Sequence, residues 1–79
     1  MSKASVYFTL GHVDGKHDVK KLKKELDTLP GVLSVSVSDG SNRVAVDFDT
    51  TGVQSDRISK QLEKMGYEVL DSSLENHVM

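Results

Sequence analysis

The order of hydrophobic patterns along this chain is the feature that most restricts its fold. Residues 5–10 (SVYFTL) alternate apolar and polar side chains, as do residues 32–38 (VLSVSVS) and 43–48 (RVAVDF). A period of two residues is typical of strands with one buried face. Residues 16–29 instead carry apolar side chains at helical spacing. An amphipathic helix is therefore expected between the first two strands.

Turn-forming residues and a second amphipathic segment organise the rest of the chain. Pro30 ends the first helix because proline lacks an N–H and disfavours helical geometry at the residue before it. The short Gly-containing connection at residues 39–42 (DGSN) predicts an antiparallel hairpin. A second helix is expected from Ser55, a good N-cap residue, to just before Gly66. Residues 67–70 (YEVL) then form a short fourth strand.

The order strand, helix, strand, strand, helix, strand predicts an α+β fold. Right-handed crossovers place both helices on one face of a four-stranded antiparallel sheet, which is a ferredoxin-like βαββαβ sandwich. A length of 79 residues supports one domain over residues 1–79 with a single modest core. We expect the compact part to cover residues 3–71 and residues 72–79 (SSLENHVM) to form a polar C-terminal tail.

Composition excludes several function classes. The chain has no Cys, which rules out disulfides, thiolate metal sites and cysteine nucleophiles. A formal net charge of -2 with mixed signs argues against a general polyanion binder. No long apolar run and no basic-then-apolar N-terminus are present, so we expect no membrane insertion and a cytoplasmic location.

The second half of the chain carries a set of motifs that resembles the heavy-metal-associated domain family. The set comprises the turn LPGV, the strands VSV and VAVDFD, the helix beginning near Ser55 and the closing GYEV. This family includes copper chaperones and the N-terminal modules of metal-pumping ATPases. With the first helix included, the resemblance covers about nine-tenths of the chain. It implies the same ferredoxin-like fold.

The chain departs from this family at the loop where the family binds its metal. The resemblance places the family's Gly-Met-x-Cys-x-x-Cys loop on residues 12–18 (HVDGKHD), with Gly15 and Asp18 at the two Cys positions. Val13 stands at the Met position and retains an apolar side chain for the core. Because Cu(I) prefers thiolate and thioether ligands, we do not expect a conventional Cu(I) chaperone.

The same loop has two alternative interpretations. Imidazole and carboxylate groups suit Zn, Ni, Co or Cu(II), so the loop is a candidate for a weak divalent-metal site. The candidate ligands are His12, Asp14, His17 and Asp18. Alternatively, Asp14 or Asp18 caps the first helix and both histidines are exposed surface residues. The sequence leaves both interpretations open.

A basic stripe on the first helix is the second candidate site. It consists of Lys16, Lys20, Lys23 and Lys24, whereas acidic residues lie largely elsewhere in the chain. In the family that the chain resembles, lysines on this helix dock acidic partner domains; a solvated helix face is the alternative. The resemblance also brings Tyr67 close to the metal loop, where it either covers residues 12–18 or packs in the core. We therefore include Tyr67 with the four lysines among the candidate partner-docking residues.

Enzymatic and nucleic-acid functions find little support in the residues. The segment GHVDG is similar to the phosphate loop of acylphosphatases, but the position of their essential Arg falls on Val19. RNA binding on the open sheet face needs several aromatic side chains, and only Tyr7 is available. We therefore predict a non-enzymatic interaction or regulatory module with an acidic protein partner. The alternative is a weak divalent-metal carrier or sensor.

Overall fold

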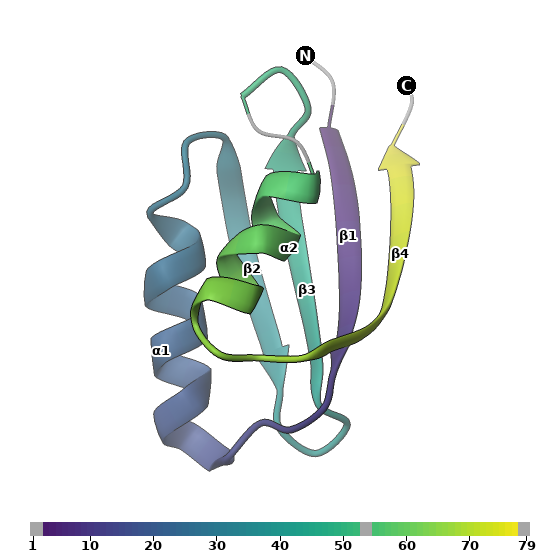
Figure 1. Ribbon diagram of the computed structural model, residues 1–79. Helices are drawn as coiled ribbons and strands as arrows, with labels where there is room; N and C mark the ends of the chain where they lie inside the picture. The colour runs from purple at the N-terminus through teal and green to yellow at the C-terminus, as the bar shows by residue number, and fades with distance from the viewer. Residues whose placement is uncertain (1–2, 53–54, 78–79) are drawn as a thin grey trace.

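The alternating segments of the sequence form one sheet in the computed structural model, which describes residues 3–52 and 55–77. The elements in chain order are β1 (Lys3–Leu10), α1 (Gly15–Asp27), β2 (Val32–Ser38), β3 (Arg43–Asp49), α2 (Ser55–Lys64) and β4 (Val69–His77). The four strands are antiparallel in the order β2-β3-β1-β4. Both helices cover the same face of this sheet (Figure 1). The predicted ferredoxin-like sandwich is confirmed.

The core lies between the helices and the inward face of the two central strands. The alternation of β1 and β3 puts every second side chain into this layer, and α1 and α2 each add one apolar stripe. The most deeply buried apolar residues are Ala4, Val6, Phe8, Leu10, Leu22, Leu26, Val44, Val46, Phe48, Ile58 and Leu62. The hydrophobic periods of the sequence therefore identify the buried faces correctly.

The outward sheet face is polar and hydrogen-bonded. The Asp47 carboxylate on β3 accepts hydrogen bonds from the hydroxyls of Ser5 and Ser34 on the two neighbouring strands, the latter at 2.9 Å. The Tyr7 hydroxyl donates to Glu75 Oε2 at 3.2 Å. These bonds tie all four strands together on the side without helices. None of the helices among the described residues is long and apolar enough to cross a membrane.

The last strand is longer than the sequence predicts. β4 runs from Val69 to His77 and pairs with β1, with one irregularity at Leu70, which has no partner residue on β1. The prediction of a polar tail at residues 72–79 is therefore wrong for residues 72–77, while residues 78–79 lie outside the described part. The strand forms because its backbone pairs with β1, and an edge strand needs no buried face of its own. The compact part accordingly extends beyond residue 71.

The core assignment is testable at Leu22, which is fully buried on α1. We expect Leu22→Ala to lower the free energy of unfolding by about 3 kcal/mol, because the lost methyl groups leave a cavity. The exposed neighbour Lys21 is the matched control. Lys21→Ala is expected to change the free energy of unfolding by less than about 0.5 kcal/mol. Urea denaturation measures both values. Equal stabilities of the two variants would contradict the core described here.

Candidate functional site

The connection from β1 to α1 is held between two other loops. The backbone N–H of Leu10 donates to the carbonyl of Asn42 (2.8 Å), and that of Gly11 donates to the carbonyl of Glu68 (2.9 Å). Val13 then turns into the core, with 8% of its surface exposed. This anchoring leaves His12 and Asp14 on the surface on either side of Val13. The expected core role of Val13 is confirmed.

Asp18 holds the start of α1. Asp14 occupies the N-cap position, but its side chain makes no capping bond. Instead, the Asp14 backbone N–H donates to Asp18 Oδ2 at 2.7 Å. A side chain in the first turn that reaches back to the N-cap N–H is one half of a capping box. Of the two predicted caps, Asp18 therefore contributes the carboxylate and Asp14 only its backbone.

Tyr67 reaches this loop because of the way α2 ends. The N–H of Gly66 donates to the carbonyl of Glu63 (3.0 Å), and the N–H of Tyr67 donates to that of Leu62 (3.1 Å). This pair of bonds is a Schellman motif, and Gly66 supplies the positive φ of 93° that it requires. The chain reverses there and directs Tyr67 back toward the β1–α1 loop.

The Tyr67 ring packs beside His12. The two ring centroids are 5.7 Å apart, with an interplanar angle of 36°. Only 6% of Tyr67 is exposed, so the side chain supports the loop from within the domain. Tyr67 was predicted as a docking residue as well as a cover for the loop. Its burial leaves it little surface for a partner to contact.

Hydrogen bonding and charge couple Asp18 to Tyr67. The pKa of Asp18 lies below its ordinary value of 3.8, chiefly because of the hydrogen bond from Asp14, with further contributions from the Tyr67 hydroxyl and the two nearby histidines. Burial, the hydrogen bond to Asp18 and the negative charges of Asp18 and Asp14 raise the pKa of Tyr67 to about 12. Near neutral pH, Tyr67 is therefore a fixed donor to an ionised carboxylate.

Three of the four predicted metal ligands come together at this loop. His12, Asp14 and Asp18 each offer a ligand atom, and these atoms all lie within 4.8 Å of one another. His17 is exposed on α1 and is not part of this group. One imidazole and two carboxylates suit a divalent ion of the zinc type. Since zinc bonds are about 2.0–2.2 Å long, the exposed side chains must move closer together to share an ion.

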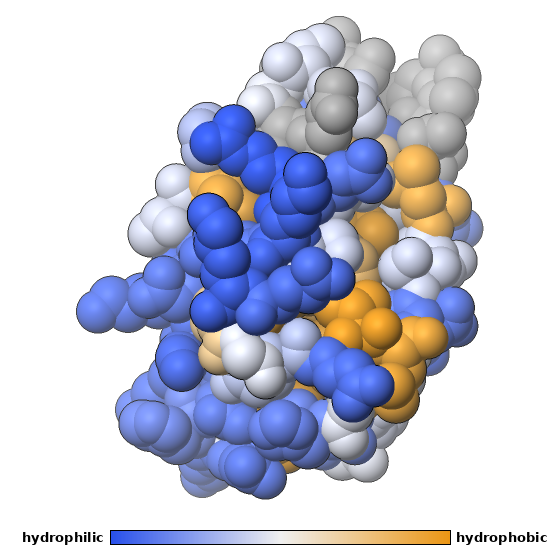
Figure 2. Space-filling model, viewed as in Figure 1, coloured by the Kyte–Doolittle hydropathy of each residue, from blue (hydrophilic) through white to orange (hydrophobic). Residues whose placement is uncertain are grey.

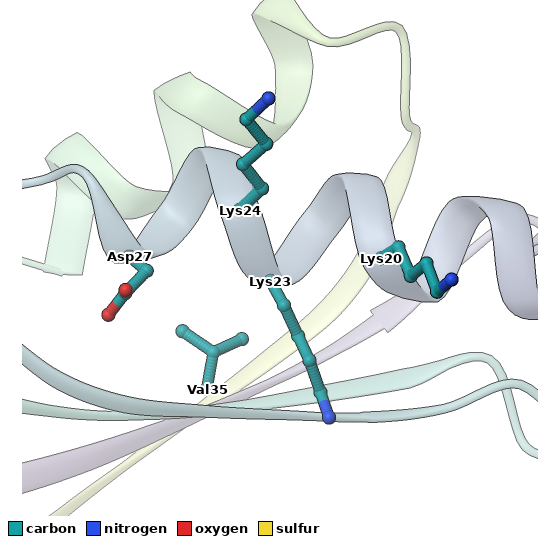
Figure 3. A pocket seen from close by; sticks show the side chains of 5 residues that line it. All are labelled: Lys20, Lys23, Lys24, Asp27 and Val35. Atoms are coloured by element: carbon teal, nitrogen blue, oxygen red, sulfur yellow. The ribbon is translucent and has the colours of Figure 1, made fainter.

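The predicted basic stripe surrounds a hollow between α1 and β2. A hollow of about 430 Å³ is lined by Lys20, Lys23, Lys24, Asp27 and Val35. Figure 3 shows Lys23 and Asp27 extending from α1 toward β2 on either side of Val35. Lys24 points away from β2, and Lys16 does not line the hollow. The lysines therefore spread over a broad face of α1, and only some of them border the hollow. The sequence pattern did not indicate that Asp27 and Val35 also line this hollow.

The lysines of α1 give this helix an excess of positive charge. Lys16, Lys20, Lys23 and Lys24 are all exposed. Among the residues that the structure describes, no carboxylate forms an ion pair with any of them. The helix contains five Lys against three acidic residues, whereas the whole chain has a formal net charge of -2. The basic character of the molecule is thus concentrated on α1, and the remainder is acidic.

The sandwich and its polar β1–α1 loop define a class of small domains, and the comparisons identify the family. The profile described as "Heavy-metal-associated domain" matches residues 8–68. This chain therefore belongs to the heavy-metal-associated domain family. The comparison with curated proteins finds no match.

Several solved structures share the fold of this chain. Oxidized MerP from Ralstonia metallidurans CH34 is 21% identical, with a TM-score of 0.78 over 91% of this chain and 96% of that one. A CopZ metallochaperone is 21% identical, with a TM-score of 0.80 over 84% and 98% of the two chains. The copper binding domain from HMA7, a P-type ATPase, is 25% identical, with a TM-score of 0.75 over 92% and 99%.

The donor groups present do not fit a soft monovalent metal. The chain contains no Cys, and Gly15 and Asp18 stand where the resemblance to the family places its two thiolates. Gly15 also has a φ of 68°, which side chains other than glycine rarely adopt. The loop offers nitrogen and oxygen ligands only, so the fit is to a divalent ion.

The pKa of Asp18 predicts an effect of acid on stability. Because folding lowers this pKa, ionised Asp18 stabilises the fold above its ordinary value of 3.8, and this contribution is lost as the pH falls through the lower folded value. We expect the free energy of unfolding in urea to fall more steeply below pH 3.8 for chelator-treated wild type than for Asp18→Asn. Asp39→Asn, in the exposed β2–β3 turn, is the control and should behave as wild type. Parallel acid profiles for wild type and Asp18→Asn would contradict this role.

Proposed function

We propose that this domain is a cytoplasmic protein-interaction or regulatory module that binds an acidic protein surface through the lysine face of α1. The lysine face comprises Lys16, Lys20, Lys23 and Lys24. The observation that carries the proposal is that these ammonium groups are exposed and make no ion pair with the described residues. Clustered charge of one sign raises the association rate with a partner of opposite sign. The proposal assigns no catalytic role to the domain.

The hollow beside β2 favours a partner with both charge and an apolar side chain. Val35 is half-buried between Lys23 and Asp27. An apolar partner side chain contacting Val35 would be flanked by lysines that pair with its neighbouring carboxylates. Apolar contact at the centre with charge at the rim is the usual arrangement of a small protein interface.

Charge reversal tests this docking surface. The probe is a fluorescein-labelled peptide of Asp and Glu with a central Leu, and fluorescence anisotropy measures its binding at low salt. We expect the triple variant Lys20→Glu, Lys23→Glu, Lys24→Glu to weaken binding by at least about tenfold, or about 1.4 kcal/mol. The weakening should shrink as salt screens the charges.

Two exposed lysines of α2 provide the matched control. Lys60→Glu with Lys64→Glu alters charge on the neighbouring helix of the same face. This double variant should retain most of the affinity, and amide NMR shifts caused by the peptide should concentrate on α1 and β2. Similar losses in both sets of variants, or shifts spread evenly over α2, would exclude a docking surface on α1.

A weak divalent-metal site in the β1–α1 loop is the second candidate function. The supporting observation is the convergence of His12, Asp14 and Asp18. Asp18 already accepts hydrogen bonds from Asp14 and Tyr67. Because a metal ion would compete with these bonds, we expect its affinity to be low, which suits a sensor or buffer better than a tight carrier.

A comparison of substitutions at His12 and at His17 distinguishes this candidate site from non-specific metal binding. Titration with Zn²⁺ or Ni²⁺, followed by amide NMR, should shift the signals of residues 11–19 and Tyr67. His12→Ala should abolish these shifts, whereas His17→Ala, outside the group, should leave them in place. The response should also weaken in acid, since a protonated imidazole cannot ligate a metal. Equal effects of the two substitutions would exclude the site.

A further inference from the structure

The outer edge of β4 has no neighbouring strand among the described residues. The sheet order places β4 beside β1 only, so within the described residues its other side is unpaired. β4 is nine residues long and contains neither Lys nor Pro, the residues that commonly block pairing at sheet edges. The backbone groups on that side have no strand partner among the described residues.

Two leucines expose apolar surface along this edge. Leu70 is 58% and Leu74 is 52% exposed. Leu74 lies opposite the buried Val6 of β1, so it is on the helix side of the sheet. The helices do not extend over β4 in Figure 1, and Figure 2 shows apolar surface along this margin of the molecule. The edge therefore combines backbone groups that pair with no other described strand and leucines that no helix covers.

We propose that β4 pairs antiparallel with β4 of a second copy of this chain, in a register centred on Ser72. A twofold axis through Ser72 sets Leu70 of each copy opposite Leu74 of the other, two residues to either side of the axis. The same register places Asp71 opposite Ser73. The sheet would then continue across eight strands, twice the four of one copy.

Neighbouring registers are disfavoured by charge. If the twofold axis passed through Ser73, Asp71 of each copy would lie opposite Glu75 of the other. If it passed through Asp71, the two Asp71 residues would lie opposite each other. Like charges directly opposite one another destabilise paired strands. A shift of one residue also separates the leucines from each other. The register centred on Ser72 is thus favoured by both its apolar pairs and its charges.

The opposite edge of the sheet suits a second copy poorly. β2 packs beside α1, whose lysines border the hollow next to this strand. Two copies meeting there would bring lysine faces of like charge together. Pairing through β4 instead leaves both α1 faces free, so that the dimer would present two docking surfaces at its ends.

Association is expected to be weak and concentration-dependent. The Ser72 backbone N–H donates to Asp71 Oδ1 at 2.9 Å, and strand pairing would replace this bond. A contact limited to one strand edge is also at the small end of protein interfaces. The net free energy of association is therefore expected to be small, because part of the gain from strand pairing is offset by the loss of this bond.

Sedimentation equilibrium over a concentration series tests the dimer. The apparent mass should rise from 8.7 kDa toward twice that value as the concentration increases. Leu74→Lys should weaken association at least tenfold, whereas Leu33→Lys should not. Leu33 is the matched control because it is also 52% exposed but lies on β2. A mass that stays monomeric throughout, or equal effects of the two substitutions, would overturn the proposal.

Cysteine cross-linking tests the register in a chain without native Cys. Residues directly opposite on paired strands have Cα atoms about 4.5–5.5 Å apart, within the range that disulfides span. Ser72→Cys should therefore form a covalent dimer under mild oxidation at least ten times faster than Ser73→Cys. Both positions are exposed. Equal rates would indicate random encounters and would overturn the register.

Discussion

The Asp18 carboxylate is the interaction on which the arrangement of the candidate site depends. It accepts the Asp14 N–H at the start of α1 and the Tyr67 hydroxyl from the segment after α2. These two partners belong to opposite halves of the chain, so one side chain fixes the loop, the helix start and the position of Tyr67 together. The approach of His12 to Asp14 and Asp18 follows from this arrangement, since His12 rests against the Tyr67 ring. The donors thus gather around a carboxylate that already has a structural role.

The backbone at Gly15, and not only the residue type, is unfavourable for a Cys at this position. A φ of 68° is open to glycine, but it costs roughly 1–2 kcal/mol for most other residues. No atom lies within 4 Å of the place where a Cβ at Gly15 would be, so the obstacle to a Cys there is conformation rather than space. Restoring two cysteines would therefore also require α1 to begin differently, and the Asp14–Asp18 bond would be lost with it.

Periodicity was sufficient to predict the fold because the core is formed by side chains at regular spacing. The alternation of Val6, Phe8 and Leu10 and the helical spacing of Leu22 and Leu26 each identify a buried face. The second half of β4 escaped prediction because its pairing with β1 depends on backbone hydrogen bonds, which leave no hydrophobic period in Ser72 and Ser73. In the loop, residue types indicated the correct chemistry, but only geometry separates His12 from His17. The depth at which Tyr67 is buried likewise follows from the Schellman turn at Gly66, a local backbone feature that its own residue type does not reveal.

The two proposed functions are linked by charge and are therefore not independent. Asp14 and Asp18 lie at the N-terminal end of α1, beside Lys16, and their negative charge partly offsets the lysine face. A divalent ion held by these carboxylates would cancel that charge and make the same end of the helix more positive. An acidic partner would then bind the metal-loaded form more tightly, and by reciprocity the partner would strengthen metal binding by the same factor. A low intrinsic metal affinity would therefore be compatible with the proposed regulatory role. Partner binding would supply free energy for metal binding and so would offset the cost of breaking the hydrogen bonds that Asp18 already accepts.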